Sequence, residues 1–211
     1  MMKRGSPRGI RDTIFSLVFL LLAAFGSRLW LNHRNADNGQ QKPQRVNGRE
    51  DLLRPNDAFR CAIYDGNFSL VKALLKNDPG LVNKVSGPVT PLSMAIAHKR
   101  PEIVQFLVAN GADVNLQDSA GQTALVFAAS YGETKIAKLL IECGAKVEIG
   151  DSDASPLHAA AGMGNLETVR LLLGKGANIN SRDREGRTPL YWAEGTHSAD
   201  VVAFLKSRGG R

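Results

Sequence analysis

Few residues of this 211-residue chain have the types and spacing that catalysis or cofactor binding requires. No GxSxG, P-loop or HExxH motif occurs in the sequence. Residues 162–164 (Gly-Met-Gly) begin like a dinucleotide-binding loop, but the last glycine of that fingerprint is absent and no strand pattern precedes it. The sequence therefore predicts a protein that is not an enzyme and binds no cofactor.

Metal binding is not indicated either. The four histidines lack ligand spacing, and no CxxC pair is present to bind zinc. Asp151, Asp153 and Ser155 match the first three ligands of a calcium loop, but Pro156 and Gly162 stand where glycine and glutamate are required. We expect no metal site, and we expect both cysteines to pack as small apolar side chains without a disulfide.

The net charge of +7 is concentrated before residue 51. Residues 51–211 carry 18 basic and 17 acidic residues, so the folded part has no excess positive field to hold nucleic-acid phosphates. The 43% hydrophobic content and the chain length suit one substantial folded unit. These properties exclude disorder throughout and argue against nucleic acid as a partner.

The N-terminal residues have the pattern of a targeting segment. Four basic residues precede an apolar run over residues 14–26, and Ala24 and Gly26 suit the positions before a cut at Ser27. As a helix this run spans about 20 Å, short of the roughly 30 Å hydrocarbon core, so an uncleaved anchor needs the apolar residues that follow. We expect residues 1–31 to be a signal peptide or a membrane anchor that engages the membrane at least during export.

Both alternatives place the rest of the chain across the membrane, because basic residues before the apolar run stay in the cytoplasm. The expected location is therefore periplasmic or secreted, or anchored in the membrane with the folded part outside the cytoplasm. Residues 32–50 contain almost no apolar side chains and cannot offset the entropy of ordering. They are predicted to form a flexible, disordered linker.

Two landmarks recur in phase after this linker. A hydroxyl residue followed closely by leucine recurs at intervals of 33, 32 and 33 residues, and a Gly-Ala pair keeps the same step. Two ladders in phase indicate stacked structural repeats. The hydroxyl residues are Thr90, Thr123, Ser155 and Thr188, and the pairs begin at Gly111, Gly144 and Gly176.

Four segments carry a family resemblance: TPLSMAIA (90–97), TALVFAAS (123–130), SPLHAAAG (155–162) and TPLYWAEG (188–195). Together with the GADVN and GANIN endings of two units, they resemble the ankyrin repeat. The resemblance implies an all-α solenoid of about five helix-turn-helix units with hairpin-like loops, preceded by the apolar helix and the linker. The implied units lie at about 55–84, 85–117, 118–149, 150–182 and 183–211, the first being a degenerate capping unit.

The residues of each unit suit these roles. Threonine or serine caps a first helix, recurring alanines let neighbouring helices approach, and glycine ends the second helix in a left-handed conformation. Lys99 and His197 stand where other units have an inter-helix glycine, so we expect strain at those turns. From the family, His158 is expected to hydrogen-bond between adjacent units. Tyr191 and Trp192 are expected to pack within the last unit.

Partners of ankyrin repeats usually meet the loop tips and the variable face of the first helices. The resemblance therefore implies a non-enzymatic, monomeric scaffold that binds a protein partner outside the cytoplasm. The alternative is a membrane-anchored structural adaptor with an uncleaved N-terminal helix. The candidate contact residues are Val89, Ser119, Gln122, Asp151, Arg184, Glu185 and Arg187 at the tips, and His98, Tyr131, Met163 and Thr196 on the helical face. Tyr131 and Met163 are adjacent by repeat phase and are expected to form a small hot spot.

Overall fold

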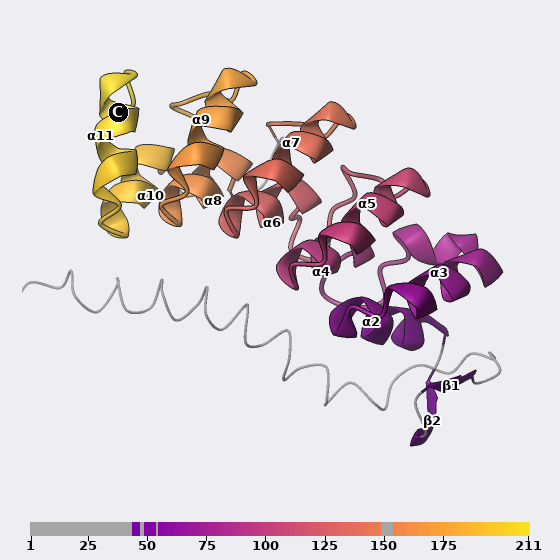
Figure 1. Cartoon of the computed structure of the whole chain (residues 1–211). Helices are drawn as coiled ribbons and strands as arrows, with labels where there is room; N and C mark the ends of the chain where they lie inside the picture. Colours follow the sequence, from indigo (N-terminus) through magenta and orange to yellow (C-terminus); the bar gives the residue numbers. More distant parts are fainter. Residues whose placement is uncertain (1–43, 47–48, 54, 149–153) are drawn as a thin grey trace, which may run out of the picture. The chain divides into compact units, whose positions relative to one another are not determined.

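The structure, a computed structural model, describes residues 44–46, 49–53, 55–148 and 154–211. These residues include ten α-helices arranged as five consecutive pairs (Figure 1). The pairs are α2 (Pro55–Asp65) with α3 (Phe68–Asn77), α4 (Pro91–Ala97) with α5 (Pro101–Ala109), α6 (Ala124–Ser130) with α7 (Thr134–Glu142), α8 (Pro156–Gly162) with α9 (Leu166–Gly174), and α10 (Pro189–Gly195) with α11 (Ala199–Ser207). A short 3-10 helix, η1 (Pro79–Asn83), follows α3.

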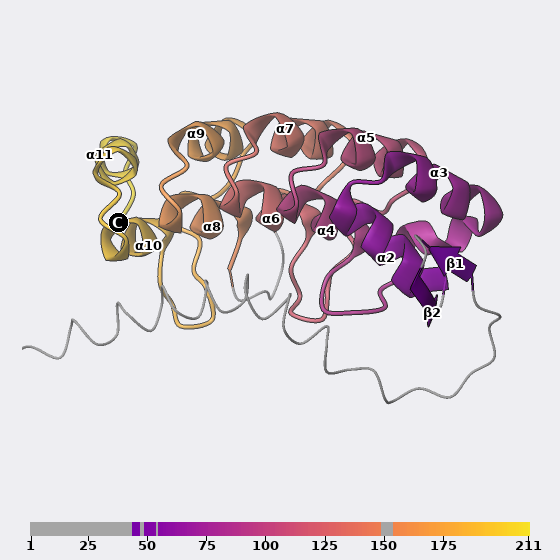
Figure 2. The same ribbon diagram turned by 60° about the horizontal axis from the view of Figure 1, so that its bottom comes forward.

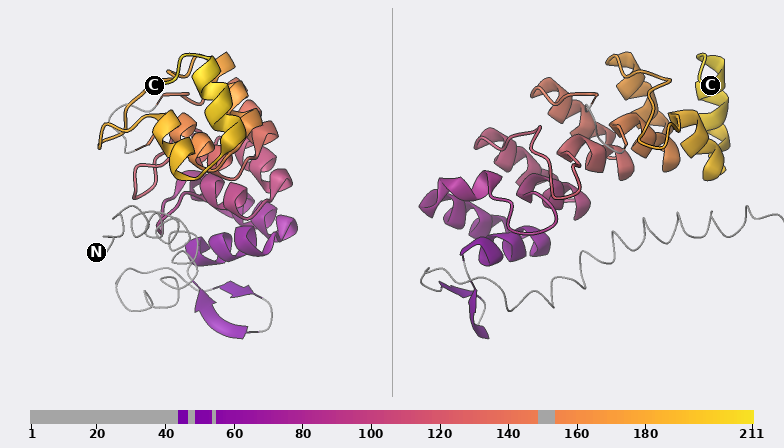
Figure 3. Two further views of the ribbon diagram at one scale, coloured as in Figure 1. Left: turned by 90° about the vertical axis from the view of Figure 1, so that its left-hand side faces the viewer. Right: turned by 180° about the vertical axis from the view of Figure 1, so that it is seen from behind.

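The helices form two layers. The first helices of the pairs pack on one another in chain order from α2 to α10, and each also packs on the second helix of its own pair. Figure 2 shows the second helices, α3 to α9, as one row above the first helices, with the connecting loops projecting beyond the other side. Figure 3 shows the same succession from behind. We call α2, α4, α6, α8 and α10 the inner helices and their partners the outer helices.

Two of the four repeating hydroxyl residues form the predicted helix cap. Thr90 accepts a hydrogen bond from the N–H of Ser93 at 3.1 Å, and Thr188 accepts one from Tyr191 at 3.4 Å. At Ser155 the hydroxyl bonds instead to the imidazole of His158 in the first turn of α8, and the same ring accepts from the Ser155 N–H. The hydroxyl oxygen of Thr123 is buried and has no hydrogen-bond partner among the described residues, so α6 starts without this cap.

Small residues set the spacing of the inner helices, as predicted. The repeating alanines are 0% exposed, and the leucines of the same helices are at most 7% exposed. The close approach is clearest at Gly162, where an added Cβ would lie 2.9 Å from Cε3 of Trp192 on α10. The buried residues in question are Ala95, Ala128, Ala160 and Ala193, with Leu92, Leu125, Leu157 and Leu190.

Two turns between inner and outer helices hold residues other than glycine in a left-handed conformation. Lys99 has φ 53° and His197 has φ 58°, where three other units use glycine at φ 67° to 74°. The strain expected at these two turns is therefore confirmed.

Asparagine side chains connect consecutive loops. Asn83 donates from Nδ2 to the carbonyl of Gly111 at 2.9 Å and accepts at Oδ1 from the N–H of Asp113 at 2.8 Å. Asn115 and Asn180 make the same pair of bonds to the units that follow them. Glu148 occupies the fourth such position, where its carboxylate accepts from a backbone N–H at 2.7 Å but has no amide to donate.

The helical solenoid agrees with the all-α prediction, but a short antiparallel hairpin is added before it. Strand β1 (Gln44–Val46) pairs with β2 (Arg49–Leu53), and both strands contact α2. This hairpin lies largely in the segment predicted as a linker. Backbone pairing needs no apolar periodicity, so the side-chain pattern gave no sign of it.

The predicted signal peptide or anchor, residues 1–31, and most of the linker lie outside the described residues. In the described part of the chain, no helix has the length and apolar character needed to cross a bilayer.

The cysteine prediction was wrong for one of the two residues. Cys143, at the end of α7, is exposed, while Cys61 of α2 is half-buried. Both thiols are free. Burial raises the pKa of Cys61, and the nearby carboxylates of Asp65 and Asp57 raise it further, so this thiol stays protonated.

Candidate protein-binding surface

Four of the predicted contact residues end the inner helices. His98, Tyr131, Met163 and Thr196 are the residues that follow α4, α6, α8 and α10, so successive units place them at equivalent positions. Tyr131 is 39% exposed and Met163 is 51% exposed. We call these four residues the inner row.

The structure adds a residue to this surface that the sequence analysis missed. Tyr64 of α2 is 50% exposed, and its ring lies 4.4 Å from that of His98, edge to face. Its unit lacks the repeat motif, so phase alone did not single it out. Tyr191 is also exposed, which contradicts the prediction that it packs in the last unit.

The inner row is uncharged at neutral pH. Burial lowers the pKa of His98, and the charge of Arg100 lowers it further, so its imidazole is neutral. Burial raises the pKa of Tyr131, which keeps its hydroxyl protonated. The row therefore offers aromatic and thioether surface together with neutral hydrogen-bonding groups, a combination typical of the centre of a protein interface.

A buried carboxylate, that of Asp118, organises the loop tip before α6, at residues 118–122. Oδ1 of Asp118 accepts from the N–H groups of Ala120 and Gln122, each at 2.9 Å. Ser119 is exposed and donates its hydroxyl to the carbonyl of Pro88 at 3.0 Å, while Gln122 is half-buried. Val89, in the loop before α4, is half-buried and packs against the core, so only Ser119 of these three candidates is exposed.

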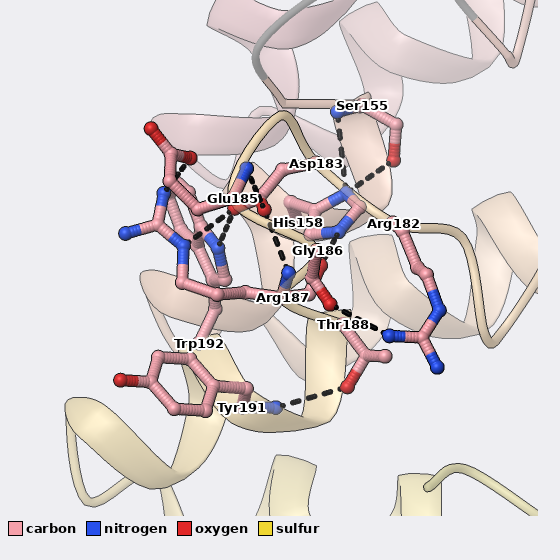
Figure 4. Close-up of polar contacts among 10 residues, drawn as sticks. All are labelled: Ser155, His158, Arg182, Asp183, Glu185, Gly186, Arg187, Thr188, Tyr191 and Trp192. Carbon is pink, nitrogen blue, oxygen red and sulfur yellow. Dashed lines mark hydrogen bonds and ion pairs between the residues drawn. The ribbon is translucent and has the colours of Figure 1, made fainter.

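In the last loop tip, at residues 182–187 before α10, the charged side chains pair with one another (Figure 4). Arg187 donates from Nε to Asp183 at 2.7 Å and from Nη2 to Glu185 at 2.6 Å. The indole N–H of Trp192 donates to the same Asp183 oxygen at 2.8 Å. Arg187 and Glu185 are thus engaged within the loop, and Arg184 is exposed beside them. The remaining tip candidate, Asp151, lies outside the described residues.

The electrostatics of Asp183 follow from these contacts. Burial by itself raises the pKa of this carboxyl, but hydrogen bonds from Trp192 and Arg187, with the charge of Arg187, outweigh it and lower the pKa. At the equivalent Asp118 burial dominates and raises the pKa, because only backbone groups donate to it. Asp183 is therefore held by side-chain donors as well as backbone donors, whereas Asp118 is held by backbone donors alone.

The prediction for His158 is confirmed. Its Nε2 donates to the carbonyl of Arg187 at 3.0 Å, which joins α8 to the last loop (Figure 4). Nδ1 then accepts from the N–H and the hydroxyl of Ser155, at 3.2 and 2.9 Å. Arg60 of α2 fills the same place in the first unit and donates to the carbonyl of Val89 at 3.0 Å. Sequence analysis missed this bond because an arginine replaces the histidine.

No group of three or more potential metal ligands gathers among the residues that the structure describes.

Comparison with known proteins agrees with this architecture. A family model for ankyrin repeats, in three copies, matches residues 59–151 and 148–210. The chain belongs to the ankyrin repeat family. Inversin from Canis lupus familiaris is 34% identical over 159 residues, which is 71% of this chain and 15% of inversin. The ankyrin repeat and SAM domain-containing protein 6 from Rattus norvegicus is 39% identical over 170 residues, 76% of this chain and 19% of that protein.

A putative palmitoyltransferase, ZDHHC13 from Danio rerio, is 33% identical over 149 residues. The match covers 68% of this chain and 23% of that protein, and it reflects the ankyrin region alone. The chain thus spans less than a quarter of the length of each of these three relatives.

Proposed function

We propose that this ankyrin repeat protein is a non-enzymatic scaffold that binds a protein partner through the inner row and the neighbouring loop tips. The observation that carries the proposal is the row itself. Exposed side chains of Tyr131 and Met163 stand at equivalent positions of adjacent units, and Tyr64 with His98 extends the aromatic surface by two units. Aromatic rings and flexible thioether side chains of this kind commonly anchor protein interfaces.

The test uses the double variant Tyr131→Ala/Met163→Ala in the full-length chain. Proteins that copurify with the wild-type chain from its own cell are quantified by mass spectrometry. We expect the variant to retain about tenfold less of a specific partner, because two anchor residues are truncated. Lys138→Ala, which removes an exposed side chain of α7, is the matched control and leaves retention unchanged. Equal retention by all three proteins contradicts the proposal.

We propose further that the repeats act outside the cytoplasm, as a monomer, after export directed by residues 1–31. Support comes from the basic residues, the apolar run and the small residues at the expected cut. The alternative is an uncleaved helix that anchors the repeats as a structural adaptor. Intact mass and N-terminal sequencing of the protein from soluble and membrane fractions separates these two. A chain that starts near Ser27 in the soluble fraction supports cleavage, and a full-length chain found only in membranes supports the anchored adaptor.

A further inference from the structure

Lys99 and His197 occupy positions at which the fold favours glycine. The turns of three other units carry Gly66, Gly132 and Gly164 in the same left-handed conformation. Lysine and histidine reach that conformation at a cost in stability, because their Cβ crowds the backbone. The two units therefore keep side chains that destabilise their own turns.

The fold makes no use of these two side chains. Both residues are exposed, and neither side chain has a hydrogen bond or an ion pair with any described residue. Their backbone N–H groups donate to Ile96 at 3.0 Å and to Glu194 at 3.2 Å. Gly132 makes the equivalent backbone bond in its own unit. A glycine at either position would therefore keep the turn and relieve the strain.

Both residues adjoin the inner row. Lys99 follows His98 in the second unit, and His197 follows Thr196 in the fifth. With neighbouring inner helices about 10 Å apart, the two side chains are separated by roughly 30 Å along the row. An extended segment at about 3.3 Å per residue bridges that distance with about nine residues.

We infer that Lys99 and His197 are partner-specificity residues, which bind carboxylates of an acidic segment lying along the inner row. This inference rests on the proposed function. An ammonium and an imidazole both donate hydrogen bonds to carboxylates, and a charge on either partner strengthens such bonds. Residues held in costly backbone conformations persist where the conformation or the side chain serves a function. Acidic residues spaced along the segment meet Lys99 and His197, and its apolar side chains pack on Tyr131 and Met163.

The experiment measures stability and binding in the same variants. Random peptides of about twelve residues, long enough to cover the row, are displayed on phage and selected on the full-length chain in mild detergent. Peptides whose binding falls with Tyr131→Ala define the set that occupies the row. This set is then measured on Lys99→Gly, His197→Gly and the double variant, with Lys99→Arg as the conservative change and Lys175→Ala as the charge control.

We expect the row-binding peptides to be enriched in aspartate and glutamate. The double glycine variant should melt at a higher temperature than the wild type and still bind these peptides about tenfold more weakly, which is the effect of losing a charge-assisted hydrogen bond. Lys99→Arg and Lys175→Ala should bind as the wild type does.

Two failures can be told apart. If no selected peptide loses affinity with Tyr131→Ala, the proposed use of the inner row is wrong. If Tyr131→Ala weakens binding but the glycine variants bind as tightly as the wild type, the row binds a partner and the specificity role of Lys99 and His197 is wrong. Row-binding peptides that lack acidic residues overturn the inference in the same way.

Discussion

His158 joins the last two units, and its removal gives the sharpest test of how the stack is held together. The imidazole is 1% exposed, donates to the carbonyl of Arg187 and accepts from the N–H of Ser155. His158→Ala leaves both backbone groups without these partners, at about 1–3 kcal/mol each if they stay buried. We expect a total loss of about 3 kcal/mol, which lies within the summed range for the two groups.

For a domain of this size that loss corresponds to a fall in Tm of about 6–12 °C. Thermal and urea unfolding followed by circular dichroism at pH 7.5 measures it. His98→Ala is the matched control, because its half-buried ring contacts Tyr64 but bridges no backbone groups between units; it should cost less than about 1 kcal/mol. A loss below about 1 kcal/mol for His158→Ala, or equal losses for the two variants, would refute the bridging role.

The same histidine predicts how stability depends on pH. Burial lowers the pKa of His158, so below its ordinary value near 6.5 the unfolded chain binds the proton more readily than the folded one. Stability from this group is complete above pH 6.5 and falls as the pH drops toward the lowered folded pKa, by at most about 1.4 kcal/mol per unit. His98 contributes with the same sign. His158→Gln should therefore show a flatter decline between pH 6.5 and 5 than the wild type, and an unchanged slope would contradict the assignment.

Three further variants test the charge network around Asp183, the packing at Gly162 and the asparagine hydrogen bonds between loops. Asp183→Asn should lower the free energy of unfolding in urea by about 2 kcal/mol, because it breaks the buried pair with Arg187. Asp118→Asn keeps an acceptor for its backbone donors and should cost less than about 1 kcal/mol. Equal costs would contradict the network. Gly162→Ala should lower the free energy of unfolding by about 1–3 kcal/mol and alter the fluorescence of the neighbouring Trp192. At Gly174 an added Cβ meets nothing within 4 Å, so Gly174→Ala should be neutral or stabilising. Asn115→Ala should cost about 2 kcal/mol, since two hydrogen bonds between units are lost, and a neutral result would show that these asparagine bonds add nothing to stability.

The repeat architecture could be predicted because its determinants are local and periodic. Capping hydroxyls, prolines, small helix residues and left-handed glycines each depend on a few neighbouring positions, so the phase of the motif predicted a series of stacked helix pairs. The same phase placed His98, Tyr131, Met163 and Thr196 at equivalent helix ends. The strain at Lys99 was visible because the other units supply glycine for comparison.

The residues that the sequence analysis missed or misplaced depend on contacts that the spacing of the repeat motif does not determine. Tyr64 joins the row through its ring contact with His98, across two units. His158 is buried because the next unit of the described stack packs against α8. Tyr191 occupies the equivalent position of α10, faces no further described unit and is exposed. Arg60 repeats the bridge of His158 with different chemistry.

The inner row is tested most directly by photo-crosslinking in the protein's own cell. A benzophenone amino acid replaces Tyr131 or Met163 in the full-length chain, and Lys138 on α7 serves as the control position. The proposed function predicts the same discrete protein adduct from both row positions and none from the control. Adducts that are absent from the row, or equally abundant at Lys138, would contradict binding through the inner row.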